Sequence, residues 1–529
     1  MGPTTRTCRL GLAAALLLAP AAAWADTGGL AAYLRARVAD SRGHVERAAA
    51  DYARALDGSP DAAVAIRAYR EALAAGDMAL VERALAVLDK ASVAPEDATL
   101  ISVAQAARKG DLAAVEAGAD RLARGRLVIL APAVRAWVAQ ARGRDPFPLL
   151  DTAGTEPVAR RLATEARVLL LIANEKEPEA LTLLQSLGGV DAGVDLRVAA
   201  AQLLGRRGDP ERARRLFPAD QSAVADALAR APVRPSAAFG VSRLFARVAS
   251  DLVGGEGPNP LSVTLTRAAL VAEPGNERAR LLLANTLARD GAIDRALGVL
   301  AGVDAAGPFA DAAASARISV LSEARRRPEA LADARRLAER ADAGRDDWQI
   351  YADLLLDSGR AADAVPLYRR IAEGSGAGEW VVWMQLGAAL EEAGDWPAAR
   401  AALSRAVELG PAEPIALNYL GYARLTRGED RRESARLLER AHKLAPDNAS
   451  IADSLGWAYH LTGDTRRALP LLERAAEEEP ANAEIAEHLG DAYWTLGRRY
   501  EARYAWKAAE IVADAKHKGR LTTKLARGL

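Results

Sequence analysis

The sequence predicts an all-α fold, an α-solenoid in which antiparallel helix pairs form a superhelix. Half of the 529 residues are hydrophobic, and most of these are Ala and Leu, which are strong helix formers. Aromatic residues make up only 5% of the chain, so strand-forming side chains are scarce. Glycines recur about every 34 residues, which indicates many copies of one small unit.

Residues 1–25 have the pattern of a secretory signal peptide. Arg6 and Arg9 precede an apolar run, and residues 23–25 (Ala-Trp-Ala) supply a cleavage site. Cys8, the only cysteine, lies before the apolar run, whereas a lipid-modified cysteine would follow it. We therefore expect a cleavable signal, a mature chain without cysteine and a periplasmic location.

Charge and hydropathy exclude two classes of protein. The chain has 70 basic and 70 acidic residues, and removal of the signal leaves two more acids than bases. Since no basic excess remains, we expect no binding to nucleic acid. No apolar run after the signal approaches the roughly 18 residues that a membrane-spanning helix needs, so we expect no transmembrane segment.

Four units in the C-terminal half share one pattern of small residues. Their Leu-Gly pairs are Leu386-Gly387, Leu420-Gly421, Leu455-Gly456 and Leu489-Gly490. A second glycine follows each pair, at Gly394, Gly428, Gly463 and Gly497, and prolines close three units at Pro411, Pro446 and Pro480. The first glycine allows two helices to approach closely, the second ends the first helix, and the proline ends the second helix. Ala399, Ala468 and Ala502 begin the second helices, where a small side chain allows a tight crossing.

The same register continues toward the N-terminus. Further turns between helices are expected at Gly359, Arg325, Gly291, Gly257, Gly208, Glu175, Gly143, Gly110, Gly76 and Gly43. This spacing predicts fourteen units between about residues 27 and 513, with degenerate ones between 61 and 200.

One interval is too long for a single unit. Prolines at 218, 232 and 235 surround a helical stretch, 221–230, which we interpret as an extra helix or joint. The predicted organisation is a signal peptide (1–25), a degenerate N-terminal solenoid (26–217), the joint (218–240), a C-terminal solenoid (241–513) and a basic cap or tail (514–529).

These features resemble the tetratricopeptide repeat (TPR) family. Trp383-x-x-Leu386-Gly387, Leu455-Gly456-x-x-Tyr459 and Leu489-Gly490-x-x-Tyr493 fit its opening signature. The resemblance implies a superhelix whose first helices line a concave surface that binds other proteins. From about residue 240, the chain also resembles bacterial envelope TPR proteins such as the lipoprotein partner of a carboxy-terminal processing protease. It departs from them by lacking the lipid-modified cysteine.

The sequence contains no recognised catalytic motif. It lacks a nucleophile elbow, a phosphate-binding loop after a strand and an HExxH pattern. None of the five histidines has a second histidine at i+4, as a helical metal site would require. The glycine-rich segment 374–378 falls at a repeat junction, so we interpret it as a turn. We therefore expect that the protein is not an enzyme and that it binds no cofactor and no metal.

The resemblance implies a partner-binding groove in the last three units. In this family, groove-lining side chains lie three residues before, and one and four after, the glycine of the Leu-Gly pair. Here these residues are Asn418, Tyr422, Leu425, Asp453, Trp457, His460, Glu487, Asp491 and Trp494. Aromatic rings beside carboxylates suit an extended or helical peptide. Lysine is absent from these positions, so the groove favours a basic or amide-rich partner over a terminal carboxylate. The alternative is that Trp457 and Trp494 pack between neighbouring repeats.

The leading hypothesis is therefore a non-enzymatic periplasmic scaffold or adaptor for other envelope proteins, one that brings a processing protease to its substrates. The alternative is a periplasmic component of a polysaccharide synthesis or export machine. The basic segment 514–529 is expected to cap the last repeat. The alternative for this segment is contact with an anionic membrane surface.

Overall fold

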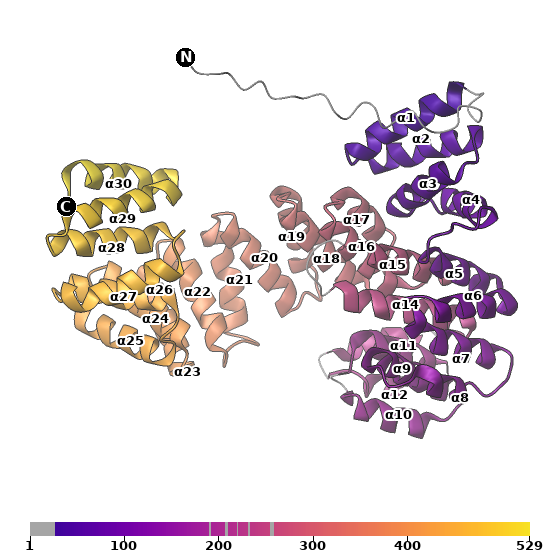
Figure 1. Ribbon diagram of the computed structural model, residues 1–529. Coiled ribbons are helices and arrows are strands. Elements are labelled where there is room, and N and C mark those ends of the chain that lie inside the picture. The colour runs from indigo at the N-terminus through magenta and orange to yellow at the C-terminus, as the bar shows by residue number, and fades with distance from the viewer. Residues whose placement is uncertain (1–26, 190–191, 207–209, 219–220, 231–232, 254–258) are drawn as a thin grey trace, which may run out of the picture. The chain divides into compact units, whose positions relative to one another are not determined.

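The computed structural model describes residues 27–189, 192–206, 210–218, 221–230, 233–253 and 259–529. Helices connected by short turns make up this part of the chain, and no β-strand occurs in it. The predicted all-α solenoid is therefore confirmed (Figure 1). The predicted signal, residues 1–25, lies outside the described residues, as do the expected turns at Gly208 and Gly257.

The chain divides into two compact units, residues 1–325 and 326–529. The described helices of the first unit are α1 (Thr27–Ser41), α2 (Val45–Gly58), α3 (Ala62–Ala75), α4 (Met78–Lys90), α5 (Ala98–Lys109), α6 (Leu112–Arg124), η1 (Val128–Leu130), α7 (Ala131–Ala141), α8 (Phe147–Leu150), η2 (Asp151–Ala153), α9 (Pro157–Ala173), α10 (Glu177–Ser186), α11 (Val194–Gly205), α12 (Pro210–Arg214), α13 (Ser222–Arg230), α14 (Ala237–Val253), α15 (Pro260–Ala272), α16 (Glu277–Arg289), α17 (Ile293–Leu300) and α18 (Ala310–Glu323).

The second unit continues the series of helix pairs to the C-terminus. Its helices are α19 (Arg327–Ala338), α20 (Arg345–Asp357), α21 (Ala361–Ala372), α22 (Trp380–Glu392), α23 (Trp396–Leu409), α24 (Pro414–Thr426), α25 (Arg431–Leu444), α26 (Ala449–Leu461), α27 (Thr465–Glu478), α28 (Ala483–Thr495), α29 (Arg499–Val512) and α30 (Ala515–Arg527).

The expected turns have a left-handed backbone at every predicted position that the structure describes. The φ angles are between 58° and 90° at Gly43, Gly76, Gly110, Gly143, Glu175, Gly291, Arg325, Gly359, Gly394, Gly428, Gly463 and Gly497. Glycine adopts this conformation without steric cost, whereas Glu175 and Arg325 adopt it with a Cβ atom. The repeat register is therefore confirmed even at the two positions where the turn residue is not glycine.

The glycine of each Leu-Gly pair lies where two helices cross closely. A Cβ atom added at Gly490 would lie 2.3 Å from Trp506, and one added at Gly387 would lie 2.6 Å from Leu403. Ala399, at the start of a second helix, is completely buried. These contacts confirm the role predicted for the small residues.

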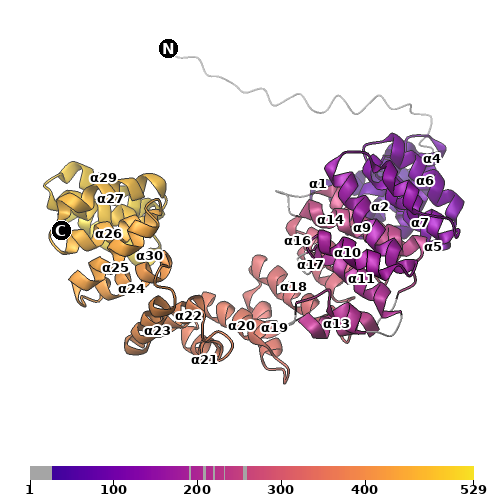
Figure 2. The same ribbon diagram turned by 90° about the horizontal axis from the view of Figure 1, so that it is seen from below.

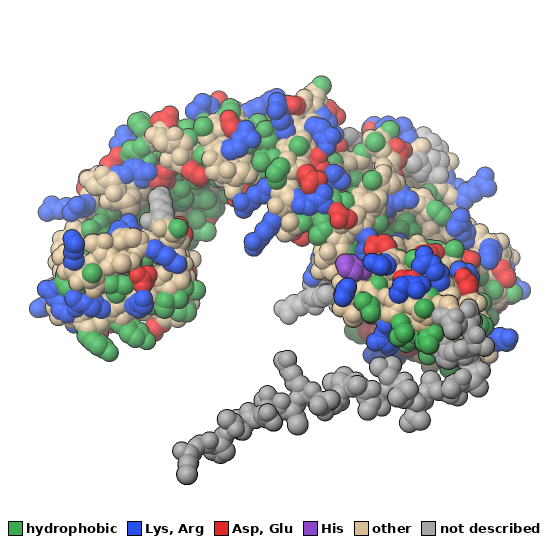
Figure 3. Space-filling view, turned by 90° about the horizontal axis from the view of Figure 1, so that it is seen from above, with side chains coloured by type: hydrophobic (Ala, Val, Ile, Leu, Met, Phe, Trp, Pro, Cys, Tyr) green, Lys and Arg blue, Asp and Glu red, His purple; other side chains and the backbone are tan. Residues whose placement is uncertain are grey.

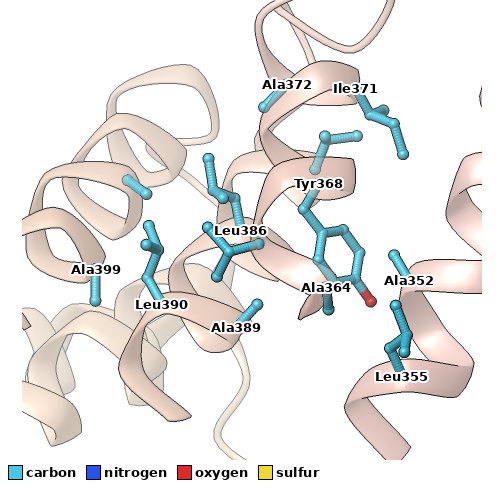
Figure 4. Close-up of a cluster of buried hydrophobic side chains, with 13 residues drawn as sticks. Ala352, Leu355, Ala364, Tyr368, Ile371, Ala372, Leu386, Ala389, Leu390 and Ala399 are labelled. Atoms are coloured by element: carbon cyan, nitrogen blue, oxygen red, sulfur yellow. The ribbon is translucent and has the colours of Figure 1, made fainter. Parts of the chain in front are cut away.

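The hydrophobic core of the second unit is a row of thin clusters between consecutive helices. Figure 4 shows one cluster, in which the side chains come from α20, α21, α22 and α23. Tyr368 is its largest fully buried side chain, and alanines such as Ala364 and Ala389 fill the space around it. In the second unit, each helix is therefore stabilised mainly by its neighbours in sequence, as expected for a solenoid.

The division between the units differs from the predicted joint. Residues 218–240 contain α13, close to the predicted helix, but they lie inside the first unit. The reason is that α14 and α15 pack against α5, and α14 also packs against α7 (Figures 1 and 2). Trp137 of α7 packs on Gly240, and Thr264 donates a hydrogen bond to Asp97. Residues 237–272 therefore belong to the same unit as the N-terminal helices.

The structure also describes the glycine-rich segment and the apolar character of the helices. Residues 374–378 form a turn between α21 and α22, as predicted. Among the described helices, none combines the length and apolar character needed to cross a bilayer. Basic and acidic side chains are interspersed on the face shown in Figure 3.

Candidate protein-binding groove

An aromatic cluster forms where the first helices of the last three repeats meet. The indole of Trp457 on α26 stacks on His488 of α28, with ring centres 4.0 Å apart and planes at 11°. His460 stacks on the same indole at 4.9 Å, and Tyr422 of α24 lies 6.4 Å from His488. We call Tyr422, Trp457, His460 and His488 the aromatic cluster.

A buried carboxylate orients the histidine of this cluster. Nδ1 of His488 lies 2.9 Å from Oδ2 of Asp453, and both side chains are more than nine-tenths buried. Burial alone would lower the pKa of His488, but the charge and hydrogen bonding of Asp453 outweigh it, so the pKa is raised. Burial lowers the pKa of His460 and outweighs the opposing effect of the nearby Asp491 carboxylate. The pKa of His488 is therefore above the ordinary value for histidine, and the pKa of His460 is below it.

Tyr422 connects the cluster to the next repeat. Its hydroxyl donates a hydrogen bond to Glu484 at the start of α28. Burial and the nearby Glu484 carboxylate raise the pKa of Tyr422, so the phenol stays protonated. Three successive first helices, α24, α26 and α28, therefore contribute side chains to one cluster.

Helix α30 covers the carboxylates at the end of the groove. Lys524 Nζ lies 2.6 Å from both Glu487 Oε1 and Asp491 Oδ2, and Arg520 lies 2.7 Å from Glu487. Burial would raise the pKa of Glu487, but the hydrogen bonds from Arg520 and Lys524 reverse this and lower it. Trp506 Nε1 also donates to Asp491, at 2.8 Å. The predicted acidic residues are therefore bound by groups of the same chain.

Trp494 is also partly covered from within the chain. The guanidinium of Arg499 lies 3.7 Å from its ring centre, and the ring of Trp506 lies 5.3 Å away. Gly528, just after α30, packs directly on the indole. Trp494 is half-buried, so it contributes less free aromatic surface than a groove-lining position implies.

The nine predicted residues thus fall into different environments. Tyr422, Asp453, Trp457 and His460 meet in or beside the aromatic cluster, whereas Glu487, Asp491 and Trp494 lie beneath α30. Leu425 is 1% exposed and belongs to the core. Asn418 is partly buried, and its Oδ1 is enclosed without a hydrogen-bond partner among the described residues.

Sequence reasoning did not assign His488, Arg520 or Lys524 to this surface. A signal for the last two was present, because Glu487 and Asp491 are four residues apart and so are Arg520 and Lys524. Residues at i and i+4 share one face of a helix, so the two pairs can face each other. His488 precedes the Leu-Gly pair and carried no such signal.

Two segments of this groove region match a known repeat. Residues 380–425 and 462–517 match the sequence patterns of two families, each described as tetratricopeptide repeat. The helix pairs thus define an α-solenoid of the tetratricopeptide type. Residues 380–425 and 462–517 are therefore tetratricopeptide repeats, and the remaining helix pairs follow the same all-α solenoid pattern. Members of this family are typically non-enzymatic scaffolds for protein–protein interaction.

Solved structures of several helical repeat proteins resemble parts or most of the chain. A tetratricopeptide repeat protein from Parabacteroides merdae is 15% identical over 48% of this chain and 98% of its own, with a TM-score of 0.40. The Cut9–Hcn1 hetero-tetramer of the APC/C is 15% identical over 94% and 90%, at 0.35. MamA from Desulfovibrio magneticus RS-1 is 18% identical over 32% and 94%, at 0.28. No curated protein sequence matches the chain.

Proposed function

We propose that the protein is a non-enzymatic periplasmic scaffold that brings a processing protease to its envelope substrates. The observation that carries the binding role is the aromatic cluster on α24, α26 and α28. Its rings are held in place by Asp453 and Glu484, so little side-chain entropy is lost when a partner packs on them. The signal-like residues 1–25 support the periplasmic location.

The partner in this proposal is a peptide or helix with basic or amide groups. Its apolar or cationic side chains would pack on Trp457. The carboxylates under α30 are already neutralised, whereas the carboxylate of Glu484 beside Tyr422 is exposed and can attract a positive charge. We therefore place the primary contact over α24 and α26.

The test is capture of partners from periplasmic extract by the immobilised protein, followed by mass spectrometry. We expect the wild-type chain to recover a peptidase together with its substrates. The double variant Trp457→Ala/Trp494→Ala is expected to lose these partners while its helix content, measured by circular dichroism, stays unchanged. The polysaccharide-export alternative predicts recovery of export-machine subunits and no peptidase, and that result would overturn the adaptor proposal.

A matched control separates loss of the surface from loss of stability. Trp396 is a half-buried tryptophan on α23, a second helix, and its indole donates to Glu429. Trp396→Ala removes a similar aromatic ring outside the groove, so we expect it to retain the partners. Equal partner recovery by the Trp457→Ala/Trp494→Ala variant and the wild type would show that the binding residues lie elsewhere.

A further inference from the structure

A hollow in the first unit, distinct from the groove, has the chemistry of a binding site. It has a volume of about 550 Å³ and is lined by residues from α4, α5 and the end of α15. Met78, Leu270 and Val271 form a half-buried apolar floor. A hollow of this size accommodates a few residues of a peptide.

A fixed cation lines one side of this hollow. Arg267 donates from Nε to Leu73 O at 2.9 Å and from Nη2 to Ala74 O at 3.3 Å, at the end of α3. Arg295 donates to the same Ala74 carbonyl, at 2.7 Å. Burial and the nearby Arg295 lower the pKa of Arg267 to about 10, so it remains charged at neutral pH. Within the described residues no carboxylate forms an ion pair with Arg267.

Two further cations lie at the rim. Arg108 and Lys109 end α5 and are exposed, and neither forms an ion pair with a carboxylate in the described part of the chain. Among the described residues Glu82 is the one acid that lines the hollow, and its carboxylate accepts a hydrogen bond from Gln105. Arg108 and Lys109 in the last turn of α5 interact favourably with the helix dipole. That effect does not account for Arg267, which lies on a different helix.

We propose that this hollow binds an acidic peptide segment of a partner protein. Carboxylates of the segment pair with Arg108, Lys109 and Arg267, and an adjacent apolar side chain packs on Leu270 and Val271. The floor is aliphatic and, among the residues that the structure describes, its lining offers no aromatic ring on which a base could stack, which favours a peptide over a nucleic acid. The chain thus has a second binding surface that selects the opposite charge from the groove.

The test measures binding of short fluorescent peptides to the full chain by anisotropy, at about 0.15 M ionic strength, where non-specific attraction is screened. One peptide alternates Glu and Leu and has an amidated C-terminus. A second has Gln for Glu and a free C-terminal carboxylate, a third has Ser for Leu, and a single-stranded oligonucleotide is the fourth probe. Binding by the first or second peptide identifies side-chain or terminal carboxylates as the ligand. Failure of both overturns the proposal.

The variant Arg108→Glu/Lys109→Glu is expected to weaken binding about tenfold or more. These side chains are exposed, so the fold should be retained. The matched control is Arg121→Glu/Arg124→Glu, which makes the same charge change on the exposed face of α6, away from the hollow, and should leave binding unchanged. Equal losses in both variants would overturn the proposal. Binding of the Ser peptide or the oligonucleotide as tight as that of the Glu-Leu peptide would also overturn it.

Discussion

At the scale of single residues, His488 makes the stability of the aromatic cluster depend on pH. Its imidazole lies against the Asp453 carboxylate and stacks on Trp457. A folded-state pKa above the unfolded value means that the pair stabilises the fold fully below about pH 6.5. This stabilisation is lost as the pH rises through the folded-state pKa. His460, with its lowered pKa, contributes in the opposite sense, because its protonation at low pH is disfavoured in the folded state.

We predict that Asp453→Asn lowers the pKa of His488 below 6.5. The substitution keeps the size of the side chain but removes the charge that offsets the burial of the imidazole. Histidine NMR titration of the wild type and the variant measures this directly. The pKa of His442 on α25, which burial lowers, is the internal control and should not change, because Asp453 does not act on it. An unchanged pKa of His488 would contradict the role assigned to Asp453.

Substitutions at two of the left-handed turns should change the free energy of unfolding in opposite directions. Arg325 has φ of 58°, so Arg325→Gly should raise the free energy of unfolding by about 0.5–1 kcal/mol by removing Cβ strain. Gly463 has φ of 90°, and Gly463→Ala should lower it by about 1 kcal/mol. Urea denaturation measures both changes. Changes of the same sign would show that contacts of the new side chain outweigh backbone conformation.

At the scale of helices, α30 is held in place by a capped first turn, a buried leucine and ion pairs with α28. Asp514 caps its first turn by accepting a hydrogen bond from the His517 N–H at 2.9 Å. Leu521 is completely buried, and Lys524 reaches two carboxylates of α28. The basic segment therefore forms the cap expected for the end of a solenoid.

Lys524→Met should destabilise the second unit by about 2–3 kcal/mol. The substitution keeps an apolar stem but leaves Glu487 and Asp491 with less compensation for their burial. Lys518→Met, on an exposed position of the same helix, is the control and should change stability by less than about 0.5 kcal/mol. Chemical denaturation of both variants tests this. Equal losses of stability in the two variants would mean that the ion pairs between α28 and α30 stabilise the unit no more than an unpaired surface lysine does.

At the scale of the whole molecule, the two units differ in how their helices are connected. In the second unit, helices pack mainly on their neighbours in sequence. In the first unit, α14 and α15 return to pack on α5, and Arg267 bonds to a carbonyl 194 residues away. The first unit therefore depends on long-range contacts that the second lacks.

This difference predicts how fragments fold. Residues 326–529 should unfold cooperatively when produced alone, because their helices carry their own nearest-neighbour contacts. Residues 27–325 should do the same, whereas 27–217 should not, because removal of α14 exposes buried groups such as Trp137. Circular dichroism during thermal unfolding distinguishes these cases. A cooperative transition in 27–217 would instead support the division near 218–240.

The sequence predicted those parts of the fold that depend on local interactions. The turn at Arg325 could be located without a glycine because the spacing of the other turns required one there. The environment of Trp457 and Trp494 could not be predicted, because it depends on His488 and on Gly528, which lie on or beside other helices. The repeat periodicity is compatible with exposure of these two side chains in the groove or with their packing between repeats. The structure shows both tryptophans half-buried.

The sequence by itself determined the helix pairs, the left-handed turns and the close glycine crossings. Each of these follows from side-chain size or backbone conformation within about one repeat. Only the tertiary structure decided that α14 and α15 return to the N-terminal helices, and that α30 covers Glu487 and Asp491. The physical reason is that these contacts join apolar faces and charges from different repeats, and a repeating pattern specifies its nearest neighbours but not its distant ones.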